Sequence, residues 1–151
     1  MVNWKKIKKY SWKAISTFVA ANAMYFGLLI GGSTICTSLS PRIHNQSELE
    51  QILTVERKRA GIKDYAHIRT RLDYKKKSNS GTYLEGEVDY FINLCPLLSN
   101  TLFNLRHELY HIADGQVNES YDTPNKIMRW IKRWYLYEPQ ASIYAATGLK
   151  L

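Results

Sequence analysis

The sequence contains little cysteine. Its 151 residues include only two, Cys36 and Cys95. Cys36 ends an apolar segment and Cys95 is alone in the region that follows, so a disulfide framework is excluded. Repeats and low-complexity segments are also missing. Hydrophobic residues make up 45% of the chain, enough for a packed core, and its length predicts one domain with an appendage.

Acidic residues are missing from the basic N-terminus. The formal net charge is +8, and five lysines in the first thirteen residues leave +3 for the remainder: Lys5, Lys6, Lys8, Lys9 and Lys13. A nucleic-acid-binding domain would show a basic stripe with interleaved aromatic side chains, and the sequence after residue 41 has none. Nucleic acid is therefore not an expected partner.

Charge of either sign is absent from Ala14 to Pro41, a run of 28 residues. Its core, Ile15 to Ile35, reaches the roughly 20 apolar residues that cross a bilayer. Trp4, Tyr10 and Trp12 lie among the lysines, as in an interfacial aromatic belt. We expect a single-pass transmembrane anchor. The excess of lysine before it predicts a cytoplasmic N-terminus and a domain on the opposite side of the membrane.

Two other interpretations of this segment stay open. A cleaved signal peptide would have a shorter apolar region, and the best small-residue site, Ala21-Asn22-Ala23, falls in the middle of this one. A buried helix of a soluble protein is the second. A lipoprotein site at Cys36 is disfavoured because Ile35 is too large. The predicted organisation is a basic tail (1–13), a transmembrane anchor and linker (14–40) and a folded domain (41–151).

Two runs of alternating residues predict strands in this domain. In residues 66–74 the inward side chains are Ile68, Thr70, Leu72 and Tyr74. A polar turn at 75–81 precedes a second run whose inward side chains are Leu84, Val88, Tyr90, Ile92 and Leu94. Arginines on one outer face and acids on the other, Glu85, Glu87 and Asp89, predict an antiparallel hairpin with cross-strand charge pairs.

Helices are predicted from capping residues. Ser47 opens a capping box, and the helix after it should end at Gly61. Ser99 or Asn100 can cap a second helix that ends near Gly115 and is followed by a loop.

The last helix should start at Asp122-Thr123-Pro124, where a cap precedes a proline. It should continue to Ala146, with Gly148 as its stop. Pro139 should kink or restart it, because proline lacks the backbone donor and clashes one turn back.

Residues 107–111, His-Glu-Leu-Tyr-His, carry the most specific motif of the chain. Positions four apart share one face of a helix, so His107 and His111 can bind one metal ion. Glu108 can then reach a water on that metal and take its proton. This is the H-E-x-x-H pattern of zinc peptidases. The alternative is two polar histidines on an amphipathic helix without a metal.

A catalytic zinc needs a third protein ligand. No histidine follows His111, and the upstream His44 and His67 are expected to be solvated. The carboxylate candidates are Asp114, Glu119, Asp122 and Glu138. Asp114 is too close along the helix to complete a tetrahedron, although it can orient a ligand histidine. Glu119 and Asp122 fall in a polar loop.

Glu138 is the preferred candidate. It lies three helical turns after Ile127 and should share the apolar face of Ile127, Ile131 and Trp134. A buried carboxylate needs a partner charge, which zinc would supply. The alternative is a glutamate that faces water beside Pro139.

The motif and its sequel, Glu138-Pro-Gln-Ala-Ser-Ile-Tyr-Ala after 26 intervening residues, resemble the gluzincin metallopeptidases. Phe91-Ile92-Asn93-Leu94 before Arg106-His107-Glu108 looks most like the small ImmA/IrrE-type and minigluzincin domains. The resemblance covers residues 84–146. It implies an α+β zincin-like fold, zinc held by His107, His111 and Glu138, Glu108 as general base, and a strand near Tyr83–Asn93 that aligns an extended peptide.

The expected function is therefore a membrane-anchored zinc metallopeptidase with peptide or protein substrates. Tyr110, Tyr135 or Tyr144 can stabilise the oxyanion. One alternative is a non-catalytic zinc-binding module of the same fold. The other is a small membrane protein whose lysine-rich tail binds anionic lipid and whose histidine motif is incidental.

Overall fold

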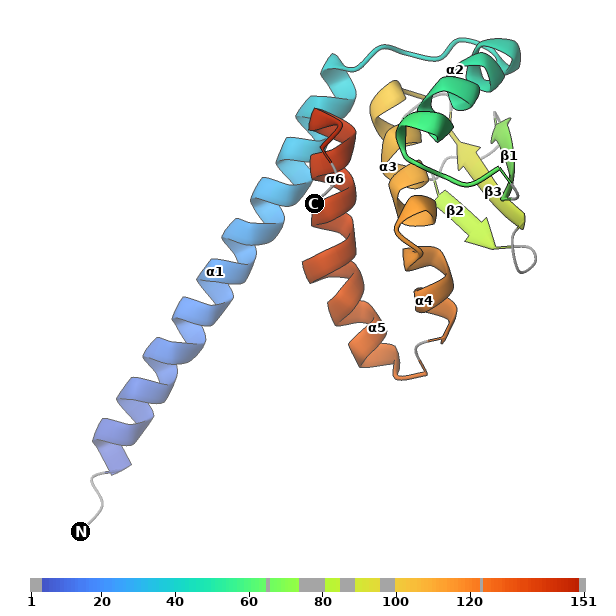
Figure 1. Cartoon of the computed structure of the whole chain (residues 1–151). Helices are drawn as coiled ribbons and strands as arrows, with labels where there is room; N and C mark the ends of the chain where they lie inside the picture. Colours follow the sequence, from blue (N-terminus) through green and yellow to red (C-terminus); the bar gives the residue numbers. More distant parts are fainter. Residues whose placement is uncertain are drawn as a thin grey trace. The chain divides into compact units, whose positions relative to one another are not determined.

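The chain has a mixed α+β structure, which we describe from a computed structural model (Figure 1). The structure describes residues 4–64, 66–73, 81–84, 89–95, 100–122 and 124–149. It divides into two compact units, Met1–Ile35 and Cys36–Leu151. Each unit is described by itself.

The first unit belongs to one long helix, α1 (Trp4–Leu39). Its stretch Ala14–Leu39 has a mean hydropathy of 1.6 and no part of it is buried. At 1.5 Å per residue these 26 residues extend about 39 Å, more than the roughly 30 Å of a bilayer's hydrocarbon core. The helix is therefore long and apolar enough to cross a membrane, as the sequence predicts.

The second unit contains a small sheet and several helices. Their bounds are α2 (Gln46–Arg59), β1 (His67–Leu72), β2 (Gly81–Leu84), β3 (Asp89–Leu94), α3 (Leu102–Ala113), α4 (Gln116–Asp122), α5 (Lys126–Lys132), the π-helical turn η1 (Arg133–Tyr137) and α6 (Glu138–Thr147). Helix α3 contacts the sheet through β2 and β3 and packs against α6 on its other side. It is therefore the central element of this unit.

The predicted antiparallel hairpin is wrong in its pairing. The strand order is β1-β3-β2, in which β1 and β3 are parallel and β2 and β3 antiparallel. The second alternating run, predicted as one strand, is divided into β2 and β3. Two reversals of direction, one before and one after β2, return β3 to the direction of β1.

In the β1–β3 register the two arginines of β1 do not lie opposite acids. Arg69 and Arg71 lie opposite Phe91 and Asn93 in the β1–β3 register, and only His67 faces an acid, Asp89. Glu85 and Glu87 lie outside the described residues, as do Tyr74 and Val88.

The predicted inward faces are confirmed where they are described. Leu72, Tyr90, Ile92 and Leu94 are buried, and the side chains of β1 alternate between exposed and more buried positions. Leu105 and Leu109 of α3 are fully buried in the same core.

The helices start at other residues than predicted, but they end at the predicted glycines. Asn45, not Ser47, caps α2, and Thr101 caps α3 in place of Ser99 or Asn100. Asn125 caps α5. Several neighbouring polar residues could serve at each start, whereas each stop needs a left-handed backbone. That conformation occurs at Gly61, Gly115 and Gly148, as predicted.

Two further differences concern the C-terminal part. Residues predicted as a loop after Gly115 form the short helix α4. The predicted last helix is interrupted by the π turn η1, in which the Glu138 N–H donates to the Arg133 carbonyl five residues back. Pro139 stands directly after this turn, near the start of α6. The restart predicted at the proline is confirmed, because a widened turn removes the need for the missing N–H.

Candidate metal centre

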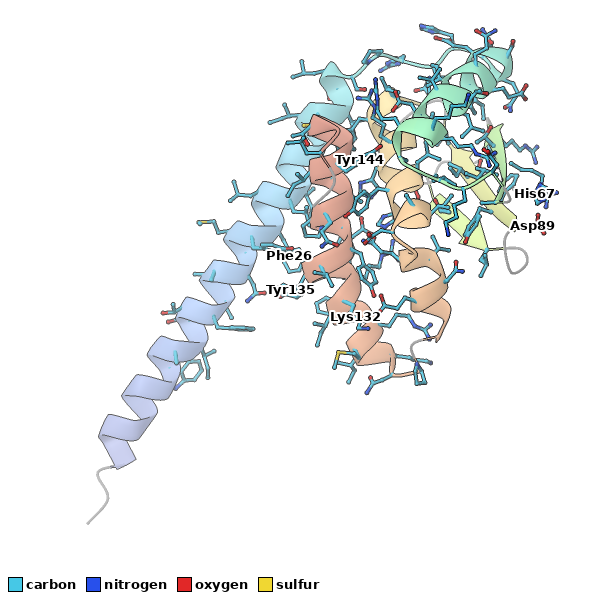
Figure 2. The ribbon with its side chains drawn as sticks, in the orientation of Figure 1. Phe26, His67, Asp89, Lys132, Tyr135 and Tyr144 are labelled. Carbon is cyan, nitrogen blue, oxygen red and sulfur yellow. The ribbon has the colours of Figure 1, made fainter. Side chains whose placement is uncertain are left out.

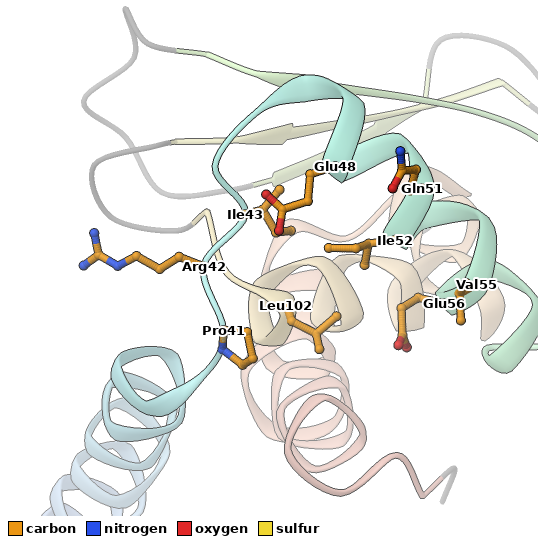
Figure 3. Close-up of a pocket in the computed structure, with 9 residues that line it drawn as sticks. All are labelled: Pro41, Arg42, Ile43, Glu48, Gln51, Ile52, Val55, Glu56 and Leu102. Carbon is orange, nitrogen blue, oxygen red and sulfur yellow. The ribbon is translucent and has the colours of Figure 1, made fainter.

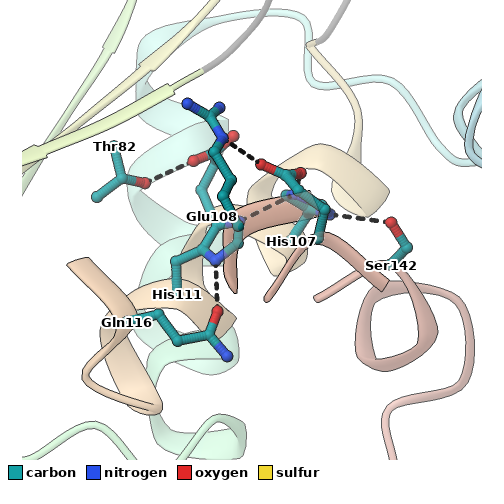
Figure 4. A network of polar contacts seen from close by, with 8 residues as sticks. Thr82, His107, Glu108, His111, Gln116 and Ser142 are labelled. Atoms are coloured by element: carbon teal, nitrogen blue, oxygen red, sulfur yellow. Dashed lines mark hydrogen bonds and ion pairs between the residues drawn. The ribbon is translucent and has the colours of Figure 1, made fainter. Parts of the chain in front are cut away.

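Helix α3 brings two histidine nitrogens to one point. His107 and His111 are one turn apart, and their Nε2 atoms lie 3.1 Å from each other. Thr101 caps the helix by accepting a hydrogen bond from the Asn104 N–H, and buried leucines on the opposite face hold it in the core. The two histidines thus project from a fixed helix, and His107 faces Glu138 and Ser142 of α6 (Figure 4).

Glu138 supplies a third ligand atom from the start of α6. Its Oε2 lies 3.1 Å from the His107 Nε2. The ligand atoms of His107, His111 and Glu138 all lie within 4.8 Å of one another. The structure therefore gathers the three residues that the sequence predicts as a metal-binding set.

Two of the three separations between these ligand atoms fit a small metal ion. Zinc binds histidine nitrogen and carboxylate oxygen at about 2.0–2.1 Å in a tetrahedral arrangement, so two such ligands lie roughly 3.3 Å apart. The two measured separations of 3.1 Å are close to that edge. A set of two imidazoles and one carboxylate also suits a catalytic zinc, which keeps its fourth position open.

The protonation of His111 follows from its neighbour Gln116. The Gln116 amide nitrogen donates to Asp114 Oδ2 at 2.8 Å and to Gln140 Oε1 at 3.1 Å, which fixes the orientation of the amide. Its oxygen therefore faces the His111 Nδ1, 2.7 Å away. Because an amide oxygen only accepts, Nδ1 must carry the hydrogen, and the Nε2 lone pair is left for a metal.

Gln116 was not anticipated from the sequence, where Asp114 was considered for this role. Asp114 acts one step further out, through the amide of Gln116. Gln116 is only 3% exposed and is the first residue of α4, the helix that replaces the expected loop. No sequence pattern marks it, because its position depends on the turn at Gly115.

His107 has a weaker outer partner. Its Nδ1 lies 3.5 Å from Ser142 Oγ, one turn along α6 from Glu138 (Figure 4). A hydrogen on Nδ1 would point at this hydroxyl and leave Nε2 toward Glu138 and His111. Both histidines can thus present Nε2 to the same ion.

The electrostatics favour a negative Glu138. Burial raises the pKa of its carboxyl, but the hydrogen bond and charge of His107, the charge of His111 and the guanidinium of Arg133 outweigh it and lower the pKa to about 2. Burial lowers the pKa of His107, yet the hydrogen bond to Glu138 and the charge of Glu108 raise it overall. Burial and the neighbouring His107 lower the pKa of His111. Without a metal, the pair His107–Glu138 thus forms an internal ion pair.

Arg133 binds the outer oxygen of Glu138. Its Nε donates to Glu138 Oε1 at 2.9 Å, while Oε2 faces His107. Arg133 opens the π turn, so the element that places Glu138 also supplies the cation that holds it. This partner was likewise not anticipated from the sequence.

Glu108 faces the sheet side of the site. Its side chain is buried, and Oε2 accepts a hydrogen bond of 2.6 Å from Thr82 Oγ1 (Figure 4). Thr82 belongs to β2, an edge strand. The expected general base is therefore next to both the candidate metal ligands and the edge strand β2.

The remaining ligand candidates are placed elsewhere. Glu119 pairs with Lys132, and the Asp122 side chain lies outside the description. His44 and His67 are exposed, as expected.

The three tyrosines considered for oxyanion stabilisation differ in how deeply they are buried. Tyr110 and Tyr144 are buried, with their rings 5.2 Å apart. Tyr135 is 41% exposed. Burial in the core disfavours the first two as donors to a substrate.

A separate pocket of about 330 Å³ lies between the linker after α1, helix α2 and the start of α3 (Figure 3). Its lining includes the apolar side chains Ile43, Ile52 and Leu102. None of the metal-ligand residues lines it, so it is not part of the metal centre.

Comparison of the chain with protein-family models, curated proteins and solved structures gives no match. The assignment of the site therefore depends on its own geometry.

Proposed function

We propose that the protein is a membrane-anchored zinc metallopeptidase with a zincin-like domain. The observation that carries this proposal is the convergence of His107, His111 and Glu138 on one point, beside a glutamate in the H-E-x-x-H position. The donor set and its spacing suit zinc. In this proposal zinc is held by these three residues.

When bound, zinc would polarise the scissile carbonyl and lower the pKa of its water toward about 7. Glu108 is the general base: its carboxylate takes the proton of the attacking water and delivers it to the leaving amine. Thr82 holds one oxygen of this carboxylate, which fixes the direction of the other. Thr82 is therefore a positioning residue.

The substrate class follows from the sheet edge. Among the described strands β2 pairs only with β3, and in this proposal its other edge accepts an extended peptide as an added strand. The resemblance implied a substrate strand near Tyr83–Asn93. Within that range β3 is the central strand, so we assign the role to β2, which also carries Thr82.

We further propose that α1 is a single-pass anchor with its N-terminus in the cytoplasm and the catalytic domain on the opposite side. The five lysines before the apolar stretch support this orientation through the positive-inside rule. The length and apolar character of Ala14–Leu39 support the span itself.

The test uses the full-length protein in lipid nanodiscs. Zinc content is measured by mass spectrometry and cleavage with a fluorescent protein substrate and a peptide library. We expect one zinc per chain, lost in His107→Ala and Glu138→Ala. Glu108→Gln should keep the zinc and lose cleavage by about 10²–10⁴-fold, the contribution of a general base.

Each other outcome has a defined meaning. Undiminished cleavage by Glu108→Gln would refute the mechanism. Stoichiometric zinc in a wild-type protein that cleaves no substrate would favour the non-catalytic module. Absence of zinc would favour the membrane protein with an incidental motif. His44→Ala is the matched control, because this histidine is exposed and outside the cluster.

A further inference from the structure

Helix α5 buries none of its residues, although four of its seven are apolar or aromatic. The exposed fractions are 72% for Ile127, 48% for Met128, 52% for Trp130 and 42% for Ile131. The following π turn adds Tyr135 and Leu136, 41% and 47% exposed. We call residues 126–136 the amphipathic segment. A monomeric soluble protein rarely leaves so many large apolar side chains together in water.

The two faces of α5 differ in chemistry. At 100° per residue, Ile127, Met128, Trp130 and Ile131 fall within an arc of about 160°. The basic residues of the helix occupy the rest: Lys126, Arg129 and Lys132. Helix α5 continues through η1 into α6, which packs against α3, so the apolar arc is not needed to hold the helix in place and is available to bind a partner.

The charge of this part of the chain favours a negative partner. Residues 124–137 contain four basic residues and no acid. Lys132 pairs with Glu119 and Arg133 with Glu138, both outside the segment's apolar arc, while Lys126 and Arg129 add positive charge at the start of the segment. Figure 2 labels Lys132 and Tyr135 on this part of the chain.

We propose that the amphipathic segment binds the surface of an anionic lipid bilayer. Aliphatic and tryptophan side chains beside Lys and Arg are the composition of helices that lie in a membrane interface. Trp and Tyr prefer the headgroup level, and each basic residue near an anionic surface adds attraction. If α1 spans the membrane as proposed above, the tether keeps the segment at high local concentration near that surface.

A protein partner or a second copy of the chain is the competing occupant. Either would call for acidic residues opposite Lys126 and Arg129 and an apolar groove for Trp130. The pocket between α2 and α3 carries both apolar and acidic side chains, but it opens on a different part of the unit from α5 (Figures 1 and 3). A bilayer needs no such complementary groove.

The experiment measures whether Trp130 touches lipid. The full-length protein with Trp4→Phe, Trp12→Phe and Trp134→Phe is reconstituted into bilayers of phosphatidylcholine with phosphatidylglycerol. Some of these bilayers carry bromine on the upper acyl chains. We expect the brominated lipid to cause a loss of Trp130 emission, because the segment would hold this indole at the boundary between headgroups and acyl chains. Lys126→Glu/Arg129→Glu should abolish the reduction.

Two controls make the result decisive. Lys58→Trp in a Trp130→Phe background places the indole on exposed α2, at the other end of this unit, and should not be quenched. Resistance to alkaline extraction reports insertion of α1 separately, so a failed anchor is distinguished from a failed segment.

Equal Trp130 emission in brominated and plain bilayers would overturn the proposal. Quenching that persists in the charge-reversed variant would also overturn it. Trp130 would then reach lipid without Lys126 and Arg129, as it would if the segment packed against the chain's own apolar helix α1. Protection of Trp130 only at high protein density would identify a second copy and also overturn it.

Discussion

Replacement of Gln116 by methionine should weaken zinc binding without removing any ligand. Gln116 Oε1 is 2.7 Å from the His111 Nδ1 and fixes both the tautomer and the ring orientation. Methionine has a similar volume and no amide, so the core position stays filled while the acceptor is lost. His111 would then be free to rotate and to move its hydrogen to Nε2, where it blocks the metal.

The size of the effect can be bounded from the structure. Gln116 is 3% exposed, so its loss leaves the buried Nδ1–H of His111 without its partner. An unsatisfied buried donor costs about 1–3 kcal/mol. Loss of an outer partner of a metal-bound histidine typically lowers affinity about 10–100-fold, or 1.4–2.7 kcal/mol, which agrees with that range. Gln140→Met is the matched control, because Gln140 only accepts from the far side of the Gln116 amide. It should cost less than threefold, since the Asp114 contact still orients the amide.

The assay is competition for zinc with a chromophoric chelator, using the full-length protein in nanodiscs at pH 7.5. Thermal unfolding of the zinc-free proteins shows whether each variant keeps its fold. A Gln116→Met protein that is folded and binds zinc within twofold of wild type would refute the argument that Gln116 orients His111. Equal losses in Gln116→Met and Gln140→Met would instead assign the effect to general packing.

Two further predictions concern pH and stability. Zinc must displace the proton that His107 holds in the ion pair with Glu138, and the pKa of His107 is raised. The zinc affinity should therefore fall as the pH drops through this raised pKa, by up to about tenfold per pH unit. A chelator titration from pH 8 to pH 5 measures this, and a flat profile would contradict the ion pair. Separately, Glu56→Leu should destabilise the fold by about 3 kcal/mol, because it leaves Arg106, which binds both Glu56 oxygens at 2.8 Å, with an unpaired charge. The free energy of unfolding is measured by chemical unfolding, and Glu56→Leu/Arg106→Leu should recover most of the stability lost in Glu56→Leu. A double variant no more stable than the single one would show that the unpaired Arg106 charge is not the cause of the loss.

The part of the site that the sequence could predict is the part that is local in the chain. His107, Glu108 and His111 are neighbours on one helix, so their relation follows from helix geometry alone. The same holds for the stops at Gly61, Gly115 and Gly148, each of which needs a left-handed backbone. These predictions depend on a few consecutive residues and not on how distant segments pack.

Strand pairing shows what alternation cannot specify. A period of two tells which side chains point inward, and Leu72, Ile92 and Leu94 are buried as expected. It contains nothing about which strand is the neighbour or in which direction it runs. The structure has a mixed three-stranded sheet in place of the predicted hairpin, and β2, the strand that carries Thr82, is one of its two edge strands.

Glu138 was predicted by an argument that does not hold in the structure. It was expected on the apolar face of Ile127 and Ile131, yet these side chains are 72% and 42% exposed, while the Glu138 side chain is 16% exposed and faces His107. A regular helix would place positions 127 and 138 within about 20° of each other. The π turn between them inserts roughly one extra residue and rotates everything after it. Glu138 is thereby turned away from the apolar arc of α5 and into the site. The wide turn also makes Pro139 tolerable, because this residue has no N–H to donate in a regular helix. The same turn thus explains two features together: a ligand that points inward and an apolar arc that is left outside.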